Sequence, residues 1–424
     1  MKVETPETVF RLRWVVLMIM GFVIIGCYYA YDSVVPIADS IIKDMGITRA
    51  QYGLLFSYYS VPNLIMVLIG GIFLDKVGIR KAGTLFTGLC VLGILLTALG
   101  PTYRLMLWGR LIYGIGAESL LVTEQKILAK WFRGKELAFA MGLNITVIRL
   151  GNLGSLNLGA HIQKWSGTWR TALWVAATLM LVSFFLYLVY SRLDKSTEPF
   201  FKASRATGEK EIFKVRDIFA FRSSYWYVAL LCVTFYSAVL PFVAFSNIFL
   251  QKKFGMTASQ GGFYVSLVFI ATMICTPLFG LFVDKMGKRT MILIFGSLLL
   301  IPVFLLLGLT NLHPAFPIFL LGISFSIVPA ALWSCVPIMV VEKRLGTAYG
   351  LIILIQNIGL TVFPWLAGKI TDLSGGEYRN TMLLFSSLGL FGLLFSLLLR
   401  FSERKGKGMG LELPTKLAQA KNLN

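Results

Sequence analysis

Charged side chains are scarce in this chain. They make up 14% of its 424 residues, whereas about a quarter of a typical soluble domain is charged. Hydrophobic residues account for 57% of the chain, and the mean hydropathy is +0.76. Apolar runs of about 20 residues recur along the sequence, and each is about the length that crosses a bilayer. The composition therefore excludes a soluble domain and predicts a polytopic membrane protein.

Acidic residues, histidines and cysteines are also few. The two histidines, His161 and His313, are far apart, so the sequence suggests no metal site. The five cysteines all lie in apolar segments and are interpreted as small core residues rather than a disulfide framework. The sequence shows no nucleophile–base pair, phosphate-binding loop or metal cluster, so we expect no enzymatic activity and no cofactor.

The net charge of +20 reflects membrane topology rather than nucleic-acid binding. If the N-terminus is cytoplasmic, 28 of the 40 Lys and Arg side chains fall on its side of the membrane and 9 on the other. Both termini are then cytoplasmic. The first apolar run has no small-residue cleavage site after it, so no removable signal peptide is expected. Twelve helices are predicted, over 14–36, 52–74, 82–100, 104–128, 137–160, 169–190, 223–250, 260–283, 290–310, 314–341, 346–368 and 380–399.

The chain contains an internal duplication. GIFLDKVGIRK (71–81) matches GLFVDKMGKR (280–289), with Asp75 and Asp284 209 residues apart. AMGLNITVIRLG (140–151) matches AYGLIILIQNIG (348–359) at an offset of 208. The fold class predicted is an all-α membrane protein of twelve helices in two six-helix repeats, which resembles the major facilitator layout. The predicted divisions are an N-terminal half 1–190, a cytoplasmic linker 191–222, a C-terminal half 223–400 and a cytoplasmic tail 401–424.

The duplicated loop resembles the gating motif of that superfamily. We expect its first glycine to let helices approach closely, its second to allow the turn, and its aspartate to latch the two halves. The alternative is a tight turn with positive charges on the cytoplasmic side. RLIYGIG (110–116) resembles the superfamily's helix-4 arginine motif, in which Arg110 either braces helix ends or touches substrate. The gating candidates are Gly71, Asp75, Gly78, Arg80, Arg110, Gly280, Asp284 and Gly287.

Three charges lie inside predicted helices. Glu118 and Arg149 are each about midway along neighbouring helices, at depths that differ by about 3 Å, so they can line one cavity. A charge inside a membrane segment is a functional hypothesis by default, although a structural salt bridge is the alternative. Asp32, nearer a helix end, is either a gate or proton site or a solvated residue. Glu124 and Lys126 are expected to face water.

The charged pair suggests a zwitterionic ligand. Arg149 offers a forked donor for a carboxylate, and Glu118 offers a site for an amine. Their repeat equivalents, Asn357 and Ser326, are uncharged. Aromatic and polar groups supply the remaining candidates, although packing explains most aromatics individually. The substrate-binding candidates are Glu118, Arg149, Tyr28, Asp32, Tyr59, Asn63, Tyr236, Gln356 and Asn357.

Several segments are similar to the lysosomal dipeptide-transporter branch of the major facilitator superfamily. They are GIGAESL (114–120), WFRGKELAFAMGL (131–143), VIRLGNLGSLNL (147–158), YYAYDSVVPI (28–37) and FYSAVLPF (235–242). The resemblance implies uniport or proton-linked movement of dipeptides. In that branch a helix-4 glutamate meets the peptide's amino end and a helix-5 arginine meets its carboxylate, and these positions are Glu118 and Arg149 here.

The resemblance has one departure. The lysosomal members are associated with a glycosylated accessory subunit, but loops here are short, and the only glycosylation triplet, Asn144-Ile145-Thr146, lies inside a predicted helix. These features favour a monomer in a bacterial inner membrane, with the lysosomal membrane as the alternative. Within transport, the other hypothesis is a monocarboxylate or organic-anion carrier. Arg149 would then bind the anion and Glu118 would be a proton site.

Overall fold

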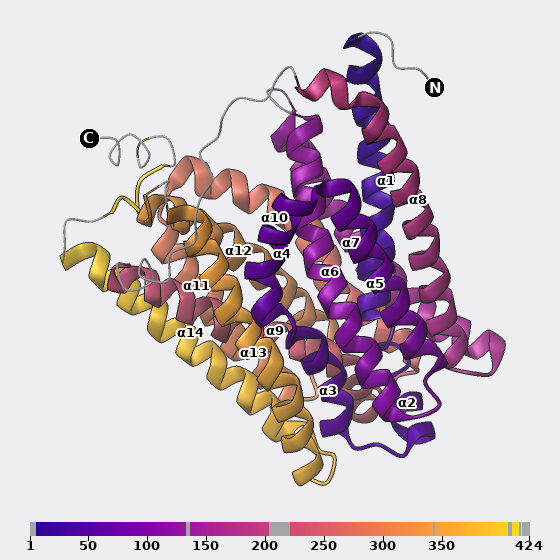
Figure 1. The fold of residues 1–424 in the computed structure, drawn as a ribbon. Helices are drawn as coiled ribbons and strands as arrows, with labels where there is room; N and C mark the ends of the chain where they lie inside the picture. Colours follow the sequence, from indigo (N-terminus) through magenta and orange to yellow (C-terminus); the bar gives the residue numbers. More distant parts are fainter. Residues whose placement is uncertain are drawn as a thin grey trace. The chain divides into compact units, whose positions relative to one another are not determined.

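The computed structural model describes residues 6–132, 136–202, 221–341, 344–405, 409–414 and 417. Every regular element in these ranges is a helix, and Figure 1 shows them coloured along the chain. The helices are α1 (Pro6–Asp32), α2 (Ala38–Met45), α3 (Arg49–Ser60), α4 (Asn63–Val77), α5 (Ile79–Leu99), α6 (Tyr103–Trp131), α7 (Leu137–Ser166), α8 (Arg170–Lys202), α9 (Ser223–Phe254), α10 (Ala258–Met286), α11 (Arg289–Leu309), α12 (Ala315–Met339), α13 (Leu345–Leu373) and α14 (Arg379–Lys405).

The predicted spans correspond to these helices with one interruption. Ten helices are long and apolar enough to cross a membrane, and α3 with α4 forms a broken eleventh. In that broken span the segments Arg49–Met66 and Ile69–Val77 meet at a bend of 61°. The remaining predicted span, α7, is 30 residues long but is not among the ten. It carries Asn144, Arg149 and Asn152 among its apolar residues, which lowers its hydropathy.

The helix end that differs most from its predicted position is that of α8. The helix predicted to end at Tyr190 continues to Lys202 as part of α8. Asp194 on this extension is held by basic side chains of other helices, Lys130 of α6 and Arg80 of α5. Residues 203–220, which hold most of the predicted linker, lie outside the described residues.

The chain divides into two compact units. Unit 1 comprises Met1–Ile37 and Val61–Lys210. In it α5 packs along α6, and α1 packs against α7 and α8. Glycines make the α5–α6 contact close, since a Cβ on Gly93 would lie 2.5 Å from the Tyr113 amide nitrogen and one on Gly109 would lie 2.7 Å from the Gly93 carbonyl oxygen. Small residues let helices approach in this way without a side chain between them.

Unit 2 comprises Ala38–Ser60 and Glu211–Asn424. Its helices include α3, which packs along α13 and can be followed beside it in Figure 1. A Cβ on Gly53 would lie 2.2 Å from the Pro364 carbonyl oxygen, and one on Gly368 would lie 2.3 Å from that of Arg49. Residues 38–60 thus pack with helices that follow them by some 300 positions, which hydrophobic periodicity cannot reveal.

Candidate functional site

The α1–α7 contact in unit 1 positions the first group of candidates. A Cβ on Gly151 would lie 2.7 Å from the Ile25 carbonyl oxygen and 3.1 Å from the Cβ of Tyr28. This close approach brings the Tyr28 side chain of α1 beside the polar face of α7. Electrostatic interactions then connect the Tyr28 phenol with Glu118 of α6 and Arg149 of α7. The structure therefore brings Tyr28, Glu118 and Arg149 together within one unit.

Asp32 joins the same neighbourhood from the last turn of α1. Its side chain is 2% exposed, and its Oδ2 accepts a hydrogen bond of 2.6 Å from the amide Nδ2 of Asn152 on α7. Arg110 and Arg149 both attract the carboxylate electrostatically. A solvated helix end, which the sequence left open for Asp32, is therefore wrong. We call Tyr28, Asp32, Arg110, Glu118, Arg149 and Asn152 the unit 1 polar cluster.

Arg110, a member of the unit 1 polar cluster, lies against two tyrosine rings. It is fully buried, and its guanidinium carbon lies 5.4 Å from the ring centre of Tyr31 and 5.8 Å from that of Tyr113. At these distances the electron-rich ring faces attract the cation. By contrast, Tyr28, Glu118 and Arg149 are only half-buried.

A second buried carboxylate lies further along α6. Glu124 is 1% exposed, and its Oε2 accepts a hydrogen bond of 3.1 Å from the Asn144 amide on α7. The expectation that Glu124 faces water is wrong, because α7 covers this face of α6. Lys126, two residues on, points elsewhere and lies 2.5 Å from the Asp75 carboxylate. The asparagines are the residues that sequence reasoning missed, and their eight-residue spacing, which places both on one helix face, was the available signal.

Of the other predicted substrate-binding residues, Asn63 belongs to unit 1 and the rest belong to unit 2. Asn63 is fully buried at the start of α4 in unit 1, and Tyr59 is buried on α3 in unit 2. On α9 the Tyr236 hydroxyl accepts a hydrogen bond of 3.1 Å from the Trp333 indole. On α13 Asn357 donates to the Ile353 carbonyl of its own helix, and Gln356 lies 3.8 Å from the Cys232 sulfur. Trp333 was another missed residue, since a tryptophan inside an apolar helix reads as packing.

The first loop motif is held by ion pairs within unit 1. Asp75 pairs with Lys126, and the Arg80 guanidinium lies 3.0 Å from Glu198 and 4.0 Å from Asp194 on the extension of α8. Lys130 also approaches Asp194, at 2.5 Å. Asp194 is 3% exposed, so it is a buried anion surrounded by basic groups.

The motif glycines divide into two groups. Gly78 and Gly287 have φ of +86° and +66°, which favours glycine and agrees with their predicted role in the turns. The prediction that Gly71 allows close helix approach is wrong. Among the described residues, a Cβ at Gly71 or Gly280 would meet no atom within 4 Å. Gly70 is the close-packed residue instead, since a Cβ there would lie 2.9 Å from the Ser119 hydroxyl.

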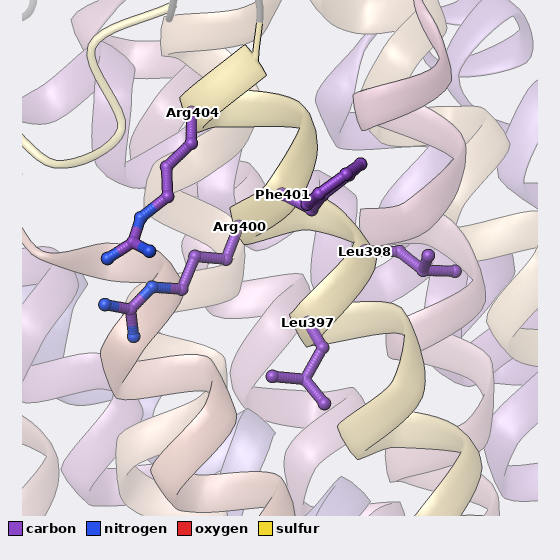
Figure 2. A pocket seen from close by; sticks show the side chains of 5 residues that line it. All are labelled: Leu397, Leu398, Arg400, Phe401 and Arg404. Atoms are coloured by element: carbon purple, nitrogen blue, oxygen red, sulfur yellow. The ribbon is translucent and has the colours of Figure 1, made fainter.

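A surface pocket lies near the end of α14, and Figure 2 shows the side chains that line it. Its volume is about 530 Å³. It is lined by Leu397, Leu398, Arg400, Phe401 and Arg404, and the two arginines extend side by side from one face of the helix. None of the predicted substrate residues belongs to this pocket. All five lining residues belong to unit 2.

Known proteins similar to this chain are membrane transporters. The lysosomal dipeptide transporter MFSD1 of Danio rerio is 34% identical over 96% of this chain and 91% of its own length. The human MFSD1 is 32% identical over 86% of this chain and 81% of its own. A protein of Cupriavidus necator described as a probable sulfoacetate transporter, SauU, is 24% identical over 90% of this chain and 93% of its own.

Solved structures agree on the fold. A mutant form of the nucleoside transporter NupG matches 91% of this chain and 99% of its own with a TM-score of 0.71, at 12% identity. The Major Facilitator Superfamily model matches residues 17–359 and 232–421. These matches also exclude an enzyme, because the family consists of transporters. The chain is an integral, multi-pass membrane protein that belongs to the major facilitator superfamily.

Proposed function

We propose that this transporter moves zwitterionic dipeptides across its membrane by alternating access. The observation that carries the proposal is the meeting of Glu118 and Arg149 with Tyr28 in the unit 1 polar cluster. The name of the MFSD1 relatives, which share about a third of their residues with this chain, supports a dipeptide as the substrate. The major facilitator fold supports alternating access.

The chemistry of the pair fits the two ends of a peptide. The Arg149 guanidinium donates two parallel hydrogen bonds to a carboxylate, and the Glu118 carboxylate accepts from an ammonium group. Each is half-buried, so a bound ligand removes little additional water from either group. Tyr28 interacts electrostatically with both Glu118 and Arg149. Its hydroxyl can form a hydrogen bond with the peptide backbone. A ligand with both charges satisfies both side chains, whereas a single charge satisfies one.

The decisive test combines Glu118→Gln with N-acetylation of the substrate. Uptake of a dipeptide and of its N-acetyl analogue is measured in proteoliposomes holding wild type or Glu118→Gln. Glu118→Gln keeps the side-chain size and removes its charge. We expect Glu118→Gln to lower the uptake of free-amine dipeptides about tenfold, because it removes one charge-assisted hydrogen bond of ~1.5–3 kcal/mol. Uptake of the N-acetyl analogue should be the same in wild type and mutant. Independent, additive losses would refute the amine contact.

An organic-anion carrier is the second candidate, and the sulfoacetate description of the Cupriavidus necator relative favours it. In that mechanism Arg149 binds the anion and Glu118 carries a proton. Glu118→Gln would then abolish uptake driven by a pH gradient and leave counterflow exchange intact. Direct uptake of dipeptides against monocarboxylates and sulfonates distinguishes the two mechanisms.

We also propose how transport is driven, the oligomeric state of the protein and the membrane in which it lies. We propose that a monomer with cytoplasmic termini carries out uniport or proton-linked transport. A bacterial inner membrane stays the predicted compartment, and the lysosomal membrane of the MFSD1 relatives is the alternative. Flux in proteoliposomes with and without a pH gradient measures the coupling.

A further inference from the structure

The second copy of the loop motif binds a segment of the C-terminal tail. The turn between α10 and α11 meets residues 409–414, where the backbone amides of Lys288 and Arg289 each donate 3.2 Å hydrogen bonds to the carbonyls of Glu412 and Leu411. The Arg289 guanidinium donates to the Leu413 carbonyl at 2.7 Å and to that of Leu411 at 3.3 Å. The turn therefore takes up backbone carbonyls of the tail.

Gly287 makes this contact sterically possible. A Cβ at this position would lie 2.4 Å from the carbonyl carbon and oxygen of Leu413. Its φ of +66° also favours glycine. The motif glycine thus serves both the turn and the passage of the tail across it.

The opposite edge of the tail is held by α14. The Oε1 atom of Glu403 accepts hydrogen bonds from the amides of Gly410 and Leu411, at 2.8 and 3.0 Å, and its Oε2 accepts one of 3.0 Å from Met409. Glu403 therefore takes up backbone amides while Arg289 takes up backbone carbonyls. The side chains of Leu411 and Arg289 are fully buried in the contact. The tail segment is therefore bound through both its backbone carbonyls and its backbone amides, and the buried Leu411 side chain adds an apolar contact.

The duplication shows what the tail replaces. Arg80 and Arg289 are equivalent at the 209-residue offset of the loop motif. In unit 1 the arginine reaches acidic groups of α8 directly, with Arg80 3.0 Å from Glu198. In unit 2 the backbone of the tail bonds to both Arg289 and Glu403. Because a buried guanidinium without acceptors is costly, Arg289 depends on the tail as Arg80 depends on the carboxylates of α8.

We propose that Gly287, Arg289 and Glu403 form a binding site for a turn of peptide backbone, which the chain's own residues 409–414 occupy as a strap, with the Leu413 amide donating to the Gly410 carbonyl at 3.0 Å. The strap completes the second loop motif and ties the α10–α11 turn to the end of α14. This inference does not depend on which substrate the transporter carries.

Hydrogen exchange of the purified full chain in detergent tests the strap. A chain ending after Gly408 lacks it, and a chain ending after Pro414 keeps it and serves as the matched control. We expect the amides of Lys288 and Arg289 to exchange at least tenfold faster in the shorter chain and at the full-length rate in the control. Equal exchange in all three chains would mean that the tail does not bind the turn, and the proposal would fall.

A double-mutant comparison identifies the anchor. The midpoint of thermal unfolding is measured for Arg289→Ala, for the chain ending after Gly408 and for both together. If Arg289 acts through the strap, the combined loss equals the larger single loss, since interacting sites are not additive. Arg80→Ala is the matched control from the first copy, and its loss should add fully to that of the truncation. Full additivity for Arg289→Ala would contradict the proposal. Glu403→Gln, a milder change, should speed exchange at Met409–Leu411 several-fold, and unchanged exchange there would also overturn it.

Discussion

At the scale of single residues, each charge in a membrane helix needs a specific partner. Two asparagines of α7 provide such partners, because Asn152 donates to Asp32 and Asn144 donates to Glu124. A neutral amide satisfies a carboxylate oxygen but leaves its charge in place, so these contacts offset only part of the cost of burial. Glu118 and Arg149 are half-buried, and both interact electrostatically with Tyr28.

Arg149 should require its forked geometry and not only its charge. We expect Arg149→Lys to lower dipeptide transport by tenfold or more, because lysine cannot donate two parallel bonds to a carboxylate worth ~1.5–3 kcal/mol. Amidating the substrate's carboxyl end should lower wild-type transport similarly and add little in the mutant. Initial uptake rates in proteoliposomes check this. Wild-type flux through correctly folded Arg149→Ala would rule out the carboxylate contact.

Glu124 should be replaceable by its neutral analogue. Its carboxylate accepts a hydrogen bond from the neutral Asn144 amide, and no ion pair links it to a cation among the described residues. A buried carboxylate in such surroundings is unfavourable. We expect Glu124→Gln to unfold at or above the wild-type temperature at neutral pH. Asn144→Ala should cost about 1–3 kcal/mol, and less in the Glu124→Gln background. Thermal unfolding in detergent measures both, and a marked loss in Glu124→Gln would show that its charge is stabilising.

At the scale of elements, helix ends are joined by groups from distant parts of the chain. The Asp372 carboxylate near the end of α13 accepts hydrogen bonds from the first amides of α3, at 3.1 Å from Arg49 and 2.8 Å from Ala50. The Arg49 guanidinium lies 3.7 Å from the same group. Amides at a helix N-terminus lack partners within the helix, so this carboxylate caps α3 and sets where it begins.

Removing the cap should loosen the first turn of α3. Asp372→Ala is expected to cost about 1 kcal/mol, as for loss of an N-cap side chain, and to speed hydrogen exchange at Arg49 and Ala50 several-fold. Asp372→Asn, which keeps one acceptor, should show a smaller effect. Asp39→Ala removes only an exposed pair with Lys43 on α2 and serves as the control. Unchanged exchange at residues 49–52 in Asp372→Ala would contradict this account.

At the scale of the whole molecule, the duplication provides two similar units whose loop motifs are stabilised differently. The first is held by ion pairs between side chains, and the second by backbone groups of the tail. Alternating access requires the two halves to move relative to each other about a site near the midplane. The Asp75 and Asp284 loops are the predicted latches of that movement.

Asp75→Asn should shift the two halves toward the inward-open state. The reason is that a latch on the cytoplasmic side stabilises the outward-open state, and loss of one exposed ionic contact changes the balance by about 0.2–1 kcal/mol, or up to several-fold in population. Distances between spin labels placed on the two halves measure the shift. Lys126→Gln breaks the Asp75–Lys126 pair and leaves Asp75 in place. An equal shift in both mutants would assign the effect to that pair, and no shift in Asp75→Asn would count against the latch.

Composition and periodicity by themselves determined the membrane class, the helical fold and the duplication. Apolar length decides what can cross a bilayer, and two matches at nearly one offset require a repeat. Glu118 and Arg149 could also be singled out, because a charge within an apolar run is visible in sequence alone. Helix geometry predicts similar depths for these two residues, whereas their grouping with Tyr28 came from the folded chain.

Tertiary structure alone decided the partners of each group. Whether Glu124 meets water or Asn144 depends on which helix covers that face of α6, and whether Gly71 or Gly70 is close-packed depends on helix rotation. The packing of residues 38–60 with α13 and the docking of the tail on Arg289 join segments more than 100 residues apart. Local sequence pattern reports the period of an element but carries no information on such distant contacts, so they follow only from the folded chain.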